Sequence, residues 1–135
     1  MYSHDTEIRV RYGETDQMGY LHHSNYALYY EAARVELMRA LGFPYGEMEK
    51  AGILMPVLNL GCKFIGPVWY DELVTVKATI LEMPTTRMKL LYEIFNEQGK
   101  KVNEGNTELC FVDANRRRPM RCPDNIAQLM KPHFK

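Results

Sequence analysis

The chain has 135 residues, 46% of them apolar, and its 17 basic residues balance 17 acidic ones. This length and composition suit one folded domain, spanning residues 1–135, and argue against a disordered chain. A chain without net charge is a poor candidate for a general nucleic-acid binder, so we expect no nucleic-acid partner.

The cysteines and the apolar segments exclude further classes. Cys62, Cys110 and Cys122 are widely spaced and form no CxxC pair, which argues against a zinc knuckle or a redox motif. The first ten residues lack the apolar stretch of a secretory signal. The longest apolar segment, "AGILMPVLNLG", is interrupted by Pro56 and Asn59 and is too short to cross a bilayer. We therefore expect a cytoplasmic protein without membrane insertion.

The first half of the chain predicts one strand and two helices. Charged and apolar residues alternate over 6–12, which is typical of a half-buried strand, and 13–19 has the composition of a loop. From residue 24 or 25 to Leu41 the spacing is helical, with Gly42 as a stop signal. A short second helix is expected to begin at Pro44 and to end at Gly52.

The long helix is expected to have one polar and one broad, aromatic half. The polar half comprises Glu31, Arg34, Glu36 and Arg39, and the apolar half comprises Tyr26, Tyr29, Tyr30, Ala33, Leu37, Ala40 and Leu41.

The second half predicts extended segments over 54–68, 73–82, 87–96 and 100–114, with a hairpin turn at 96–99. Gly105 is expected to mark a bulge or a close approach. This order predicts an α+β fold in which one antiparallel sheet wraps around one helix. Such a sheet has exposed edges, so we expect at least a homodimer, or a homotetramer, with the site built between subunits.

Several short motifs then appear in a specific order. They are Tyr12-Gly13-Glu14-Thr15-Asp16, Gly19, His23, Asn25-Tyr26, Tyr30-Glu31 and Arg34, followed by "FIGPVWYDEL" and "FVDANRRRPMRCP". Together they resemble the hot-dog-fold acyl-CoA thioesterases, most closely the 4-hydroxybenzoyl-CoA thioesterase family in its broad bacterial branch. The resemblance implies a curved sheet of about five strands around one long helix. It also implies hydrolysis of an acyl-CoA to a free acid and coenzyme A, without a metal or other cofactor. Glu14 departs from the family, which often has aspartate there.

Asp16 is the candidate catalytic residue. From the residues alone, the favoured role of a loop aspartate is to cap a turn or a helix. The resemblance implies that this carboxylate either attacks the acyl carbon or deprotonates a water. It also implies that the backbone N–H of His23 meets the oxyanion at the start of the helix. The His23 imidazole either takes part or orders the loop. Glu31 is a reserve candidate, with an ion pair to Arg34 as its structural alternative.

The expected substrate contacts fall into two groups. Tyr12 and Gly19 belong to the catalytic motif, and Tyr26 and Tyr30 either line an acyl tunnel or pack in the core. Arginines at 116, 117, 118 and 121 form the densest basic cluster, with Arg87 and Lys89 on a neighbouring strand. Guanidinium groups bind the phosphates of coenzyme A well, although a solvated strand end would look the same.

Two other functions fit part of this pattern. Hot-dog hydratases have an asparagine-proline pair before a histidine, and "DQMGYLHH" lacks that pair. A non-catalytic acyl-CoA-binding protein would share the fold but would be expected to lose the carboxylate at Asp16.

Overall fold

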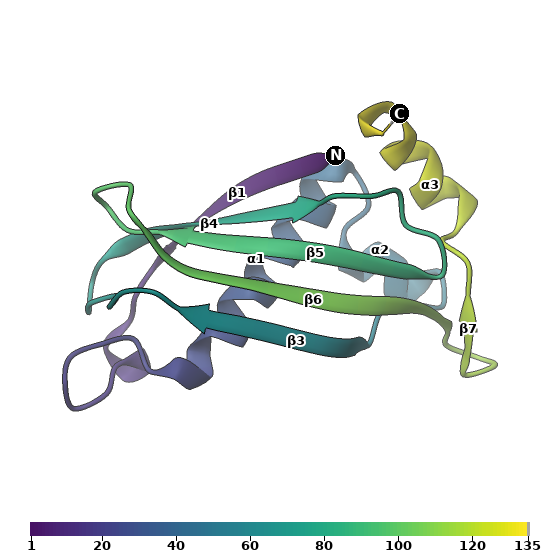
Figure 1. The fold of residues 1–135 in the computed structure, drawn as a ribbon. Helices are drawn as coiled ribbons and strands as arrows, with labels where there is room; N and C mark the ends of the chain where they lie inside the picture. The colour runs from purple at the N-terminus through teal and green to yellow at the C-terminus, as the bar shows by residue number, and fades with distance from the viewer. Residues whose placement is uncertain (135) are drawn as a thin grey trace.

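The computed structural model describes residues 1–134 and shows a curved antiparallel sheet wrapped around helix α1 (Figure 1). The strands are β1 (Tyr2–Arg9), β2 (Ile53–Leu54), β3 (Val57–Phe64), β4 (Leu73–Ile80), β5 (Arg87–Phe95), β6 (Lys101–Asp113) and β7 (Arg118–Met120). The helices are α1 (Tyr26–Leu41), α2 (Tyr45–Lys50) and α3 (Asp124–Met130), with 3₁₀ turns η1 (Tyr12–Glu14), η2 (His23–Asn25) and η3 (Lys131–His133).

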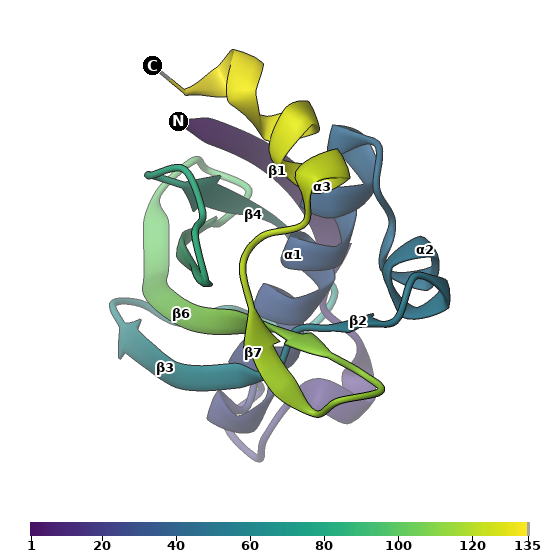
Figure 2. The same ribbon diagram turned by 90° about the vertical axis from the view of Figure 1, so that its right-hand side faces the viewer.

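The main sheet has the order β1-β4-β5-β6-β3, and all of its neighbours are antiparallel. The last part of β6 also pairs with β2 and with β7. Seen end-on, the strands curve around α1, which lies against their inner face (Figure 2). This is the α+β hot-dog arrangement that the sequence predicted.

The core forms where the period-2 faces of the strands meet α1. Val74, Val76 and Ala78 of β4 and Met88 and Leu90 of β5 are fully or almost fully buried, as their alternation predicted. They pack against the apolar face of α1 because inward residues of neighbouring strands share one side of the sheet.

The predicted boundaries of the long helix are confirmed at both ends. At the carboxyl end, Gly42 has a φ of 109° and its N–H donates to the carbonyls of Met38 and Arg39. Only glycine adopts this left-handed backbone at little cost. At the amino end, the side chain of His22 caps η2 by accepting from the Ser24 N–H. Pro44 likewise lies directly before α2, as predicted.

Two residues of α1 lie on the opposite face from the one that the helical spacing predicts. Ala40 is exposed, and Arg34, expected to be solvated, is only 6% exposed. Its guanidinium donates to the hydroxyls of Tyr45 and Tyr92, both at 3.1 Å. Because these phenols supply acceptors inside the protein, the cation can be buried without a carboxylate. Arg34 therefore does not form the expected ion pair with Glu31.

The strands also differ from the prediction in detail. β1 begins at Tyr2 and ends at Arg9, so Tyr12 lies beyond it. The expected long segment over 54–68 is split at Pro56 into β2 and β3, because proline lacks the N–H that would continue the ladder. β7 and α3 were not predicted.

Gly105 is a point of close approach and not a bulge. The irregularities of the β6 ladder lie elsewhere, between Val57 and Asn59 and between Ile94 and Phe95. A Cβ atom at Gly105 would overlap the ring of Tyr30. Glycine at this position lets α1 sit close to the sheet.

Strand β3 is an apolar edge. It pairs with β6 on one side, and within residues 1–134 no strand pairs with its other side. Large apolar side chains of β3 and the segments beside it are about half exposed, namely Val57, Leu58, Leu60, Phe64, Ile65, Trp69 and Tyr70. An exposed edge of this kind is a template for pairing with another chain. None of the helices within residues 1–134 is long and apolar enough to cross a membrane.

Candidate active site

Asp16 closes a tight turn and leaves one carboxylate oxygen free. Its Oδ1 accepts hydrogen bonds from the N–H groups of Met18 (2.9 Å) and Tyr20 (3.2 Å). Its own N–H donates to the Tyr20 carbonyl at 2.8 Å, and its carbonyl accepts from the Gly19 N–H at 3.0 Å. Within residues 1–134 no hydrogen-bond donor reaches Oδ2. The carboxylate therefore holds the turn with one oxygen while the other remains available.

Glu14, two residues earlier, has a different environment. It is 8% exposed, and its Oε1 accepts from the Arg11 N–H and the Tyr29 hydroxyl, both at 2.8 Å. Oε2 accepts from Arg11 Nη2 at 3.0 Å. Burial alone would raise the pKa of this carboxyl, but the donors from Arg11 and Tyr29 outweigh burial and hold the pKa below its usual value. Glu14 is thus ionised near neutral pH, with both oxygens occupied.

The 3₁₀ turn η2, which leads directly into α1, presents a backbone N–H that has no partner within residues 1–134. The His22 N–H donates to the Glu14 carbonyl at 2.8 Å, and the Ser24 N–H donates to His22 Nδ1 at 3.1 Å. Between them, the N–H of His23 has no acceptor within residues 1–134. It lies at the positive end of the helical segment, where a developing negative charge is favoured. This is the donor that the family resemblance assigns to the oxyanion.

The sequence left open whether the His23 imidazole takes part in the reaction or orders the loop, and the contacts of the two histidine side chains bear on the second role. The His22 ring accepts from the Ser24 N–H and lies beside the His23 ring, with centroids 4.1 Å apart and the ring planes tilted by 31°. The His23 side chain is exposed. It is therefore His22, not His23, whose imidazole orders the helix start.

Tyr12 and Gly19 border the Asp16 turn. Tyr12 is 77% exposed and lies edge-to-face with Tyr70, with ring centroids 5.6 Å apart. Gly19 has a φ of 82° and lies against the ring of Trp69. Tyr12 is thus at the surface and Gly19 is partly exposed, and both lie beside aromatic residues of the segment that follows β3.

Tyr26 and Tyr30 point into the core. Tyr26 is in edge contact with the half-exposed Phe64, with ring centroids 5.1 Å apart, and burial raises its pKa to about 12. Tyr30 is fully buried, hydrogen-bonds to Asn103, and stacks on Tyr92 with centroids 4.4 Å apart. In one protomer Tyr30 is thus a core residue, and only Tyr26 lies next to exposed surface. Glu31 is exposed on α1 and makes no ion pair within residues 1–134.

The basic residues lie at the other end of β6. Arg118 pairs with Asp113, whereas Phe64, close to the Asp16 end, pairs with Asn103. Ten residues of strand separate these positions, or about 33 Å at ~3.3 Å per residue. Figure 1 likewise shows the β6–β7 hairpin and the start of α1 at opposite ends of the molecule. One protomer does not bring Asp16 and the arginines together.

The hairpin displays its arginines outward. The Asp113 carboxylate accepts from the N–H groups of Asn115 (2.9 Å) and Arg116 (3.0 Å), and these bonds lower its pKa. Arg117 has a φ of 57°, a left-handed conformation that favours glycine. Arginines at 116, 117 and 118 are all exposed.

Arg87 and Lys89 lie on the outer face of β5, in the half of the strand nearer the hairpin. Arg87 already has a counter-charge, because its Nη1 lies 2.8 Å from Glu108 Oε1. Lys89 pairs across the ladder with the same Glu108. Both are therefore weaker phosphate-binding candidates than the hairpin arginines.

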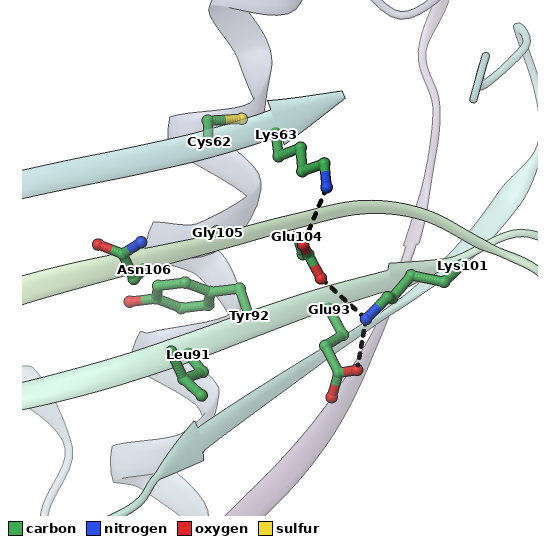
Figure 3. Close-up of a pocket in the computed structure, with 9 residues that line it drawn as sticks. All are labelled: Cys62, Lys63, Leu91, Tyr92, Glu93, Lys101, Glu104, Gly105 and Asn106. Carbon is green, nitrogen blue, oxygen red and sulfur yellow. Dashed lines mark hydrogen bonds and ion pairs between the residues drawn. The ribbon is translucent and has the colours of Figure 1, made fainter. Parts of the chain in front are cut away.

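A depression of about 520 Å³ on the outer face of the sheet does not belong to this site (Figure 3). Its rim is an ion-pair chain in which Glu104 contacts Lys63 and Lys101, and Lys101 contacts Glu93. These charges are satisfied among themselves. No group of three His, Cys, Asp or Glu side chains within residues 1–134 is placed to hold a metal ion.

Comparisons with known proteins identify the family and the fold. A family model described as "Thioesterase-like superfamily" matches residues 10–130. The solved structure of a DHNA-CoA thioesterase from Staphylococcus aureus is 38% identical, with a TM-score of 0.88, over 100% of this chain and 97% of that one.

Two curated relatives are similar in sequence over most of the chain. YneP of Bacillus subtilis, provisionally named an acyl-CoA thioesterase, is 35% identical over 85% of this chain and 83% of its own length. The acyl-CoA thioester hydrolase YbgC of Escherichia coli is 25% identical over 92% of each chain.

Proposed function

Since the chain belongs to the thioesterase-like superfamily, we propose that it hydrolyses an acyl-CoA thioester with Asp16 as its catalytic carboxylate. The observation that carries the proposal is the free Oδ2 of Asp16 on a turn packed against the helix start, where the His23 N–H is also free. A fixed carboxylate and a fixed backbone donor are what acyl transfer from a thioester requires.

Two routes use the same groups. In the first, Oδ2 attacks the thioester carbon, the coenzyme A thiolate leaves and takes up a proton, and water hydrolyses the resulting mixed anhydride. In the second, Asp16 removes a proton from a water that attacks the same carbon, the C–S bond breaks, and the coenzyme A thiolate leaves and takes up a proton. In both routes the carbonyl oxygen gains negative charge and accepts a hydrogen bond from the His23 N–H.

The active form is proposed to be a homodimer that pairs the free edges of β3. A two-fold axis perpendicular to the sheet makes the paired strands antiparallel and keeps both α1 helices on one face. The half-exposed Leu58, Leu60 and Phe64 support this pairing, because contiguous apolar surface marks an interface.

This pairing would bring the two ends of the molecule together. In an antiparallel β3 pair, the Phe64 end of one strand lies beside the Val57 end of its partner. The partner's hairpin would then approach the Asp16 turn, with the partner's Arg116, Arg117 and Arg118 facing the phosphates of coenzyme A. Each site would thus take its carboxylate from one protomer and its arginines from the other.

The test is turnover by Asp16→Asn. Asparagine keeps the shape and can accept the turn hydrogen bonds, but it is a poor nucleophile and a poor base. We expect kcat to fall by about 10²-fold or more, with folding and acyl-CoA binding retained. Thiol release should be followed with short, long and aromatic acyl-CoAs, with Glu31→Gln as the control. Normal turnover by a less stable Asp16→Asn would make Asp16 a cap, and an inactive Glu31→Gln would move the chemistry to the helix.

A further inference from the structure

We infer that Glu14 is a positioning residue that sets the place of both the Asp16 carboxylate and the His23 N–H. The inference rests on the proposed function, because it concerns how the two reacting groups of that site are held. Glu14 itself is excluded as a nucleophile because both of its carboxylate oxygens accept hydrogen bonds.

Glu14 links the loop to α1 by its side chain. The bond from the Tyr29 hydroxyl to Oε1, at 2.8 Å, is buried and joins residues far apart in the chain. The bond from the Arg11 N–H to the same oxygen anchors the start of the loop. The ion pair with Arg11 Nη2 contributes less, because the Arg11 side chain is largely exposed.

The main-chain carbonyl of Glu14 makes the second link. It accepts from the His22 N–H at 2.8 Å and from Asn25 Nδ2 at 2.9 Å. The side chain of Asn25 therefore does not cap the helix, although it stands at its start. It ties the helix start to the loop.

These links place each reacting group within two residues of a point that Glu14 fixes. Asp16 follows Glu14 by two residues, and His23 follows His22, whose N–H the Glu14 carbonyl accepts. A shift of Glu14 would therefore change the distance between the Asp16 carboxylate and the His23 N–H. Misplacement by about 1 Å can cost up to 10²-fold in rate, whereas binding of the distant nucleotide would be unaffected.

The experiment compares four variants at a temperature where each is shown to be folded. Glu14→Gln places an amide beside Arg11 Nη2 and weakens the hydrogen bonds that the Glu14 side chain accepts from Arg11 and Tyr29. Tyr29→Phe removes only the link to α1. We expect kcat to fall about 10-fold in both, with KM nearly unchanged. Glu14→Asp keeps the charge and should retain more activity than Glu14→Gln. Arg11→Gln, which keeps the backbone N–H, is the matched control and should have nearly wild-type kcat.

The outcomes separate this inference from the proposed function. If folded Glu14→Gln and Tyr29→Phe turn over like the wild type while Asp16→Asn is inactive, Glu14 is structural only and the inference is wrong. If Asp16→Asn is active, the proposed function fails first. If Arg11→Gln loses as much kcat as Glu14→Gln while Tyr29→Phe keeps wild-type kcat, the exposed ion pair holds Glu14 in place, and the inferred link from Glu14 through Tyr29 to α1 is overturned.

Discussion

The two ends of β6 differ in how their charges are balanced. Near Asn103, the carboxylates of Glu14 and Asp16 are held by donors from their own loop and from α1. Beyond Asp113, within residues 1–134, the arginines of the hairpin have no carboxylate within ion-pair distance. The first end is organised in advance, and the second carries positive charge without an internal partner.

This difference suggests separate tasks for the two ends. Chemistry requires groups that are already in place, so changes at the loop should act on kcat. Unpaired guanidinium groups suit an anion that arrives with the substrate, so changes at the hairpin should act on KM. Because about 33 Å of strand separates the ends in one protomer, both tasks meet in one site only if two protomers combine.

The largest effect should follow from separating the protomers. Leu60→Lys puts a charge at the free edge of β3, where Leu60 is 44% exposed. We expect a monomer whose activity falls by about 10²-fold, because the site would lose the partner's β6–β7 hairpin and the arginines on it. Light scattering and thiol release on the same sample measure this. Leu91→Lys, at 42% exposure on the outer face of β5, is the matched control and should remain an active dimer. A monomeric Leu60→Lys with normal turnover would contradict the shared site.

A subunit-mixing experiment should show a smaller but more specific effect. One parent carries Asp16→Asn, and the other carries glutamine at 116, 117 and 118. In a random mixture half of the dimers are mixed, so a shared site would restore about a quarter of all sites to the wild type. Activity at low acyl-CoA concentration should therefore exceed the sum of the two parents. If carboxylate and arginines act within one protomer, no intact site can form and the mixture will not exceed that sum.

Local patterns predicted much of the fold. The alternation in β4 and β5 survives in the structure because one face of each strand packs on α1. The burial of Arg34 was missed because its acceptors, Tyr45 and Tyr92, stand 11 and 58 residues away. Period and propensity contain no information on such pairs, so a helical wheel places the cation in solvent.

The candidate site was also predicted only where it depends on residues that are close together in the chain. The Asp16 turn is local, and its motif was recognisable from adjacent residues. The importance of Glu14 depends on Tyr29, 15 residues later, and was not predicted. The wide separation of the arginines from Asp16 follows from strand pairing, which the sequence does not specify before the fold is known.

The smallest effect concerns Arg117, because its backbone conformation favours glycine whereas the proposed phosphate contact requires the arginine side chain. Its φ of 57° disfavours arginine, so Arg117→Gly should relieve the turn and leave the free energy of unfolding unchanged or raise it by about 0.5 kcal/mol. Loss of one guanidinium should nevertheless raise KM for acyl-CoA by about 5-fold, at unchanged kcat, if it binds a phosphate. Acyl-pantetheine lacks the nucleotide, so its KM should not change. Arg39→Gln, on α1, removes an arginine that already pairs with Glu36 and should affect neither substrate. A variant that is more stable yet binds acyl-CoA less well would mean that the arginine is kept in a strained turn for its charge. An equal rise in KM for both substrates would assign Arg117 to the structure of the hairpin.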